Sequence, residues 1–158
     1  MKKNLSFYVV ILTISVLIIL YPTVIKAEKA HWAQTQVEQL INNYNVENVF
    51  ENIDYDQPIS ITNFKYLIKE IIDKDYNREP PNITREAIIS EFVKICADKK
   101  DLRLADMTEV NMFIYSDRAK IDEKYRKAVI LAYRKDIAKG RAPGVFAPNK
   151  EVSYGELA

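Results

Sequence analysis

The sequence is poor in the residues that usually mark a chemical site. Its 158 residues include three glycines, one cysteine and one histidine. So few glycines exclude Gly-rich phosphate-binding loops and collagen-like repeats. The single cysteine, Cys96, cannot form a disulfide within the chain, and its place in an apolar helical pattern is typical of a small core residue. We therefore expect the fold to be stabilised by packing.

Charge of either sign is also not in excess. The chain has 23 Lys and Arg residues against 22 Asp and Glu residues, a formal net charge of +1. Nothing in this balance requires a nucleic acid or an anionic membrane surface as partner. His31 has no second histidine with which to hold zinc, and the acids around Asp117 lack the spacing and turn glycine of a calcium loop. No Ser/His/Asp arrangement or nucleophile elbow is visible, so we expect no enzyme, no metal and no cofactor.

Residues 1–27 predict a targeting segment. Lys2 and Lys3 precede an apolar run over Leu5–Tyr21, and Ala27 supplies a small residue for cleavage. We predict a secretory signal peptide that is removed after Ala27. The alternative is an uncleaved signal-anchor, because the apolar run approaches the roughly 20 residues that span a bilayer. Both readings place the rest of the chain outside the cytoplasm, with membrane contact only through this segment.

The remaining chain has the pattern of short amphipathic helices separated by turn-rich loops. Apolar residues recur at helical spacing in four segments, 37–44, 64–72, 88–96 and 125–133. Hydroxyl residues stand where helices would begin, and they are expected to cap them. These residues are Ser60, Thr84 and Ser153. Only Ser153 has an acid three residues later, Glu156, so only this pair predicts a reciprocal capping box.

Two parts of the chain match each other at a separation of about 92 residues. The matched pairs are Val37 with Val129, Asn45 with Asp136, and Ser60 with Ser153. Asn45 and Asp136 follow the two helices, and we expect both to adopt the left-handed backbone that Asn and Asp tolerate best. The ordered series indicates a duplicated unit of helix, turn, proline-containing loop and capped helix.

The stretch "YSDRAKIDEKYRKAVILAYRKDIAKGRAPGVFAPNKEVSYGELA" resembles an S-layer homology repeat. Such a repeat has an aromatic-x-Asp opening, an Ala-Val pair in its first helix, a "G-x-F-x-P-N" loop and a Thr-Arg-Ala-Glu motif at its second helix. The matching residues are Tyr115, Asp117, Ala128, Val129, Ile137, Gly140, Gly144, Phe146, Pro148, Asn149 and Glu156. "HWAQTQVEQL" resembles the opening of another repeat, and "NITREAII" resembles the helix-start motif.

The resemblance implies three units of unequal quality. Residues 28–72 form a first, divergent repeat, residues 73–114 a degenerate middle repeat or an insertion, and residues 115–158 a well-matched repeat. It implies an all-α fold in which short helix–loop–capped-helix units pack as a pseudo-threefold helical bundle. By comparison with the helix after Ser60, we expect the last helix to be truncated.

The resemblance also implies attachment to a cell wall. S-layer homology domains of Gram-positive, clostridia-like bacteria bind secondary cell-wall polysaccharide on peptidoglycan without a covalent bond, often through an acidic, pyruvylated sugar. We therefore expect a secreted module of the cell surface. The alternative is a decayed scaffold with a structural or protein-interaction role and no sugar binding, because Ile61 and Tyr154 replace the motif arginine in two of three units.

Four residues match binding positions of the family. Arg85 stands at the motif arginine, and a guanidinium presents paired donors to a carboxylate. Trp32 corresponds to the family's tryptophan, Asp117 to the opening aspartate and Gly140 to the groove glycine. Judged without the resemblance, an arginine in the first turn of a helix is more often solvated or ion-paired. Trp32, on an apolar helix face, favours core packing.

Overall fold

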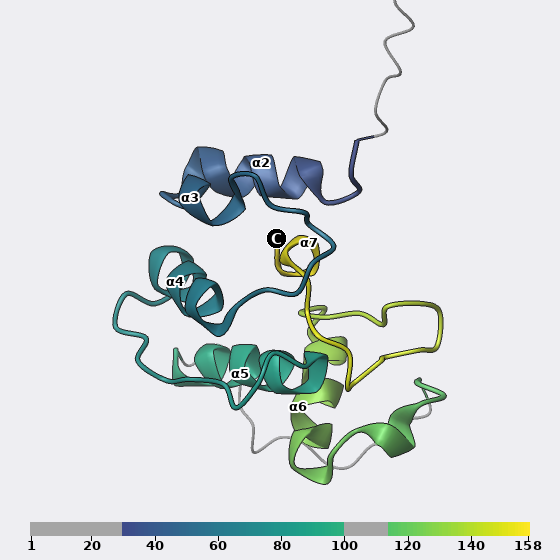
Figure 1. Ribbon diagram of the computed structural model, residues 1–158. Coiled ribbons are helices and arrows are strands. Elements are labelled where there is room, and N and C mark those ends of the chain that lie inside the picture. Colours follow the sequence, from purple (N-terminus) through teal and green to yellow (C-terminus); the bar gives the residue numbers. More distant parts are fainter. Residues whose placement is uncertain (1–29, 100–113) are drawn as a thin grey trace, which may run out of the picture. The chain divides into compact units, whose positions relative to one another are not determined.

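The computed structural model describes residues 30–99 and 114–158 of the chain (Figure 1). The chain divides into two units, Met1–Ala30 and His31–Ala158, and the features below belong to the second. The predicted signal peptide or signal-anchor lies outside the described residues and stays a prediction. None of the helices in the described ranges is long and apolar enough to cross a membrane.

The described part of the second unit is built from helices. Four of them coincide with the four predicted segments: α2 (Gln34–Asn43), α4 (Ile61–Ile71), α5 (Arg85–Asp98) and α6 (Glu123–Arg134). Three shorter ones are α3 (Glu47–Phe50), the 3-10 helix η2 (Arg118–Lys120) and α7 (Tyr154–Leu157). Isolated β-bridges occur within the described ranges, but no strand does. The predicted all-α class is confirmed.

Two predicted caps are confirmed. Ser60 Oγ accepts a hydrogen bond from the Asn63 N–H at 3.1 Å and begins α4. Ser153 and Glu156 form the reciprocal box: Ser153 Oγ accepts from the Glu156 N–H, and the Glu156 carboxylate accepts from the Ser153 N–H, both at 3.2 Å. A cap of this kind stabilises a helix by roughly 1 kcal/mol, which favours the single turn of α7.

Thr84 stands at the N-cap of α5, as predicted, but the predicted capping bond from its hydroxyl is wrong. Its hydroxyl donates to Asn82 Oδ1 at 2.6 Å, and its N–H donates to the same oxygen at 3.0 Å, so it makes no cap bond to α5. Asn side chains readily form such local bonds two residues along the chain. Asn82 therefore organises the turn before α5.

One of the two predicted left-handed turns is confirmed. Asp136, two residues after the end of α6, has φ 57°, as expected. Asn45 does not have a positive φ; in this half of the chain the left-handed residue is Asn52, with φ 55°. The reason is that α2 ends at the extended residue Tyr44 and α3 follows at once.

The core consists of two apolar clusters that share α5. The first cluster packs α2, α3, α4 and α7 around Phe64 and one side of α5, which presents Ile88 and Ile95. The second packs α6 against the other side of α5, where Ala87 and Val93 lie. A helix that is apolar on opposite faces must be covered on both. The position of α5 between the clusters follows from this pattern.

The segments that lead into three helices meet beside α5. The Ile59 N–H donates to the Val152 carbonyl at 3.0 Å, and the Val152 N–H donates to the Ile83 carbonyl at 2.9 Å. The segment before α7 therefore lies between the segments before α4 and α5. Figure 1 shows the result: α7 lies between α2 and α5. The pseudo-threefold symmetry of the arrangement stays a prediction.

Candidate functional site

A cleft of about 960 Å³ opens where α7, the start of α5 and the loop 136–141 meet. Its charged lining residues are Asp56, Arg85, Asp136, Lys139, Arg141 and Glu156. Apolar side chains line the rest, among them Trp32, Phe92 and Ile137. Concave sites that combine apolar walls with a few polar groups are typical places for ligands.

Arg85 lies at the base of this cleft and is only 7% exposed. Its Nε donates to the Phe146 carbonyl at 3.0 Å, Nη1 to Glu156 Oε1 at 2.9 Å and Nη2 to the Lys139 carbonyl at 2.9 Å. The guanidinium carbon also lies 5.4 Å from the centroid of the Phe146 ring. Burial lowers the pKa of Arg85, although the Glu156 charge favours its ionised form. Arg85 thus joins α5 to the loop and to α7.

Glu156 accepts hydrogen bonds from four donors. Besides Arg85 and the Ser153 N–H, these are Nε of Arg141 at 2.7 Å and Nη2 of Arg141. Burial raises the pKa of Glu156, but the bonds from Arg141 and Ser153 and the Arg85 charge outweigh burial and hold the pKa below its usual range. The carboxylate is therefore an anion fixed between two guanidinium groups.

Arg141 was not predicted as a site residue from the sequence. Its side chain is 36% exposed, and its Nη2 donates to the Glu151 carbonyl at 3.1 Å as well as to Glu156. It lies in an irregular loop, where no periodic pattern indicates which side chains turn inward. Its partner Glu156 is 15 residues away, and the sequence pattern around Glu156 indicates only a helix cap. No pattern in the sequence indicates that Arg141 and Glu156 form an ion pair.

Trp32 is 61% exposed, so core packing, favoured from the residues alone, is wrong. The physical reason is that α2 begins at Gln34, which leaves Trp32 in the preceding turn while Ala33 takes the buried position. A Cβ atom on Gly155 would lie 2.9 Å from Ala33 Cβ and 3.2 Å from Trp32 Cζ2. The absence of a side chain at Gly155 is what allows this turn to lie against α7.

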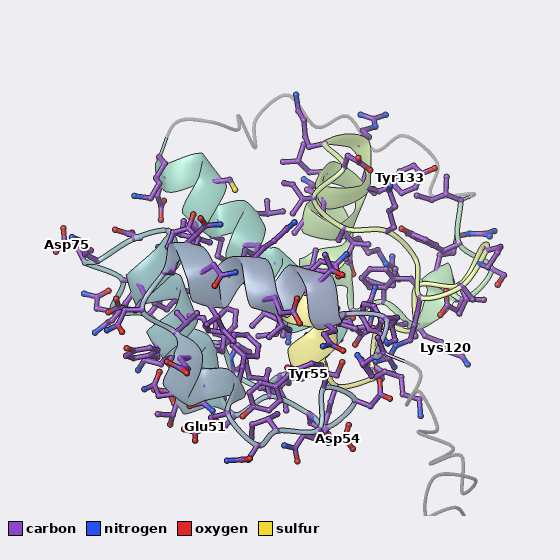
Figure 2. All side chains as sticks on the ribbon, turned by 90° about the horizontal axis from the view of Figure 1, so that it is seen from above. Glu51, Asp54, Tyr55, Asp75, Lys120 and Tyr133 are labelled. Atoms are coloured by element: carbon purple, nitrogen blue, oxygen red, sulfur yellow. The ribbon has the colours of Figure 1, made fainter. Side chains whose placement is uncertain are left out.

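The chain beyond Trp32 fastens this turn to α7 as well. The Gly155 N–H donates to the Tyr55 carbonyl at 2.8 Å, and Figure 2 shows Tyr55 beside α7. His31 bridges the two segments: its Nδ1 accepts from the Ala33 N–H at 3.2 Å, and its Nε2 lies 3.2 Å from Asp56 Oδ1. Within 30–99 and 114–158, no three His, Cys, Asp or Glu residues are grouped so that they could hold a metal ion.

Gly140 lines the cleft at a tight approach of two backbone segments. A Cβ atom there would lie 2.6 Å from the Val145 carbonyl oxygen and 3.1 Å from Cε1 of Tyr115. Any side chain would therefore force the loop apart. Arg85, Trp32 and Gly140 come from three distant parts of the sequence, and the structure brings them together around one cleft.

Asp117 does not line this cleft. Its Oδ1 accepts from the Phe146 N–H at 2.9 Å and its Oδ2 from the Ala147 N–H at 2.7 Å. Burial raises the pKa of Asp117, but these two backbone bonds outweigh burial and lower the pKa. Ala147 has φ 58°, and Asp117 fixes that left-handed turn. In this structure Asp117 holds the loop that carries Phe146 under Arg85; its predicted ligand contact stays a prediction.

The loop fixed by Asp117, the glycine at position 140 and the capping box all fall in the last part of the chain. A comparison with known protein families finds a match to the S-layer homology domain over residues 114–158. An S-layer homology domain is thus found at residues 114–158. Such domains generally anchor proteins to cell-wall polymers, and the match indicates association with the cell surface. Neither the curated proteins nor the solved structures gave a significant match.

The S-layer homology domain supplies two walls of the cleft. Gly140, Arg141 and Glu156 lie within it, whereas Trp32 and Arg85 come from outside it. The repeats expected at residues 28–72 and 73–114 stay predictions. The cleft nevertheless joins residues from both of those segments to the matched domain.

Proposed function

We propose that the chain binds secondary cell-wall polysaccharide non-covalently in this cleft and thereby holds protein at the envelope. The S-layer homology domain supports a wall polymer as the class of partner. The observation that carries the choice of site is the exposed indole of Trp32 at a cleft built partly by that domain. An aromatic ring covers the apolar face of a sugar, and nearby polar groups bond its hydroxyls.

Export and cellular context belong to the same proposal. The basic and apolar pattern of residues 1–27 supports secretion, and wall attachment suits a Gram-positive, clostridia-like cell. Binding uses hydrogen bonds and stacking, so it requires no cofactor and no reaction. The protein is accordingly proposed to be a binding module and not an enzyme.

Sedimentation with purified cell walls tests this function. The chain is mixed with peptidoglycan that retains its polymer and with peptidoglycan stripped of it, and the pelleted fraction is measured. We expect pelleting only with the polymer-bearing wall and a loss of at least tenfold in affinity for Trp32→Ala. Tyr44→Ala is the matched control, because Tyr44 is also an exposed aromatic residue but does not line the cleft. Equal sedimentation of wild type and Trp32→Ala would place binding elsewhere.

A decayed scaffold without sugar affinity is the second candidate. It is favoured by the positions of the motif arginine. Arg85 bonds three groups of its own chain, and Tyr154 is buried, with its hydroxyl accepting from Asn63 Nδ2 at 2.7 Å. Side chains at both positions thus support the fold. If the chain pellets with neither wall preparation, this second function stands.

A further inference from the structure

The charges around the cleft are matched within the protein. Three cations, Arg85, Lys139 and Arg141, face three anions, Asp56, Asp136 and Glu156. Arg85 and Arg141 both pair with Glu156, Lys139 Nζ lies 3.3 Å from Asp136 Oδ1, and Asp56 lies beside His31. The cleft therefore offers no surplus of positive charge to an incoming ligand.

Glu156 already bonds the two guanidinium groups that a ligand carboxylate would need. Two guanidinium groups converge on it, and Arg141 binds it through two nitrogens, the arrangement by which arginine recognises carboxylates. A carboxylate has about four acceptor positions, and Glu156 receives bonds from four donors. Both the carboxylate and the fork of Arg141 are thus already satisfied.

A free acid would have to compete with a tethered one. Glu156 is held by the covalent chain and by the Ser153 capping box, so it acts at the high effective concentration of an intramolecular group, of millimolar order or more. An anionic ligand would also approach Asp56 and Asp136, whose side chains are 70% and 75% exposed. Like charges placed together reject a ligand.

We propose that Glu156 is a resident carboxylate that closes the arginine pair, so the cleft prefers an uncharged sugar to an acidic one. This inference rests on the proposed function and reverses the expectation of a pyruvylated sugar. An uncharged sugar can still stack on Trp32 and make an apolar contact with Ile137, which are both exposed. Its hydroxyls can donate hydrogen bonds to the carboxylates of Asp56 and Asp136. The same two carboxylates would repel the carboxylate of an acidic sugar.

A matched pair of methyl glycosides tests the preference. One carries a 4,6-pyruvate ketal and the other a 4,6-isopropylidene ketal, so they differ by one carboxylate in place of one methyl group. Affinities for the purified chain are measured by NMR titration. We expect the wild type to bind the isopropylidene glycoside at least tenfold more tightly, with an affinity that is the same at low salt and at about 0.5 M NaCl.

The variant Glu156→Gln keeps the size of the side chain and leaves two guanidinium groups without their anion. We expect it to bind the pyruvate-ketal glycoside at least tenfold more tightly than the wild type does, with a gain that falls as salt is added. Glu151→Gln is the control, because Glu151 is an exposed acid of the same segment that does not line the cleft. It should leave both affinities unchanged.

Two results would overturn the inference. The first is a wild type that binds the pyruvate-ketal glycoside as tightly as its neutral counterpart, a comparison that needs no variant and so does not depend on the folding of Glu156→Gln. The second is a folded Glu156→Gln chain with no gain for the acid. If the wild type still pellets with polymer-bearing walls, only the inference fails. If it binds neither glycoside and neither wall, the proposed function fails as well.

Discussion

Replacing Arg85 with alanine should lower the free energy of unfolding, whether or not a ligand is present. The change removes three hydrogen bonds and the contact with the Phe146 ring. Breaking a buried ion pair by removing one partner costs about 3–5 kcal/mol. Glu156 keeps Arg141 and the Ser153 N–H as partners, so the lower end, about 3 kcal/mol, is expected.

Urea unfolding followed by far-UV circular dichroism measures this loss. With a slope of about 1–3 kcal/mol per molar urea for small proteins, the midpoint should fall by about 1–3 M. Arg85→Lys should recover less than half, because one ammonium group cannot reach three acceptors that a planar guanidinium spans. Arg134→Ala, at the exposed end of α6, should change stability by no more than about 0.5 kcal/mol.

The result that would refute this reasoning is specific. If Arg85→Ala unfolds at the same urea concentration as the wild type but no longer pellets with polymer-bearing walls, Arg85 contacts the ligand and does not hold the fold. A loss of both stability and sedimentation that Arg85→Lys fails to restore agrees with the structural role.

Three further changes have expected outcomes. Asp117→Ala leaves the Phe146 and Ala147 N–H groups without their acceptor and should lower stability by about 2 kcal/mol, seen as a lower melting temperature; an unchanged melt would contradict the bonds to Asp117. Gly155→Ala should cost about 1–3 kcal/mol through overpacking, and because Trp32 is the only tryptophan, its fluorescence should shift. The pKa of Glu156 in the folded protein lies below the ordinary 4.5. Its ionised carboxylate therefore adds to the free energy of unfolding above about pH 4.5, and this stabilisation is lost as the pH falls through the folded pKa. Glu156→Gln should flatten this acid limb of a stability-against-pH curve, and an unchanged limb would argue against the lowered pKa.

Much of the fold could be predicted because four helices carry a long apolar period. Ser60 and Ser153 fixed two helix starts through local chemistry. The helices α3 and η2 have four and three residues, too few for a period to be visible. Thr84 failed as a cap because a neighbouring amide competes for its hydroxyl, and such competition between side chains is decided only in three dimensions.

The candidate site was predictable only where a family motif marked single positions. Arg85 and Gly140 were found in this way, but the bonds of Arg85 to the 139–146 loop cross more than 50 residues and have no local signature. Trp32 was placed on a helix that begins two residues later. The pairing of Arg141 with Glu156 depends on how a loop folds over α7, which the order of residues does not reveal.

The most direct test of wall attachment is an NMR titration of the chain with solubilised secondary cell-wall polysaccharide. The single tryptophan gives one indole N–H signal, which reports directly on the cleft. We predict that this signal moves together with the backbone amides of residues 136–141 and 153–157, while those of residues 69–75 stay in place. A spectrum that does not change at a saturating amount of polymer, or changes confined to regions outside the cleft, would contradict binding at this site.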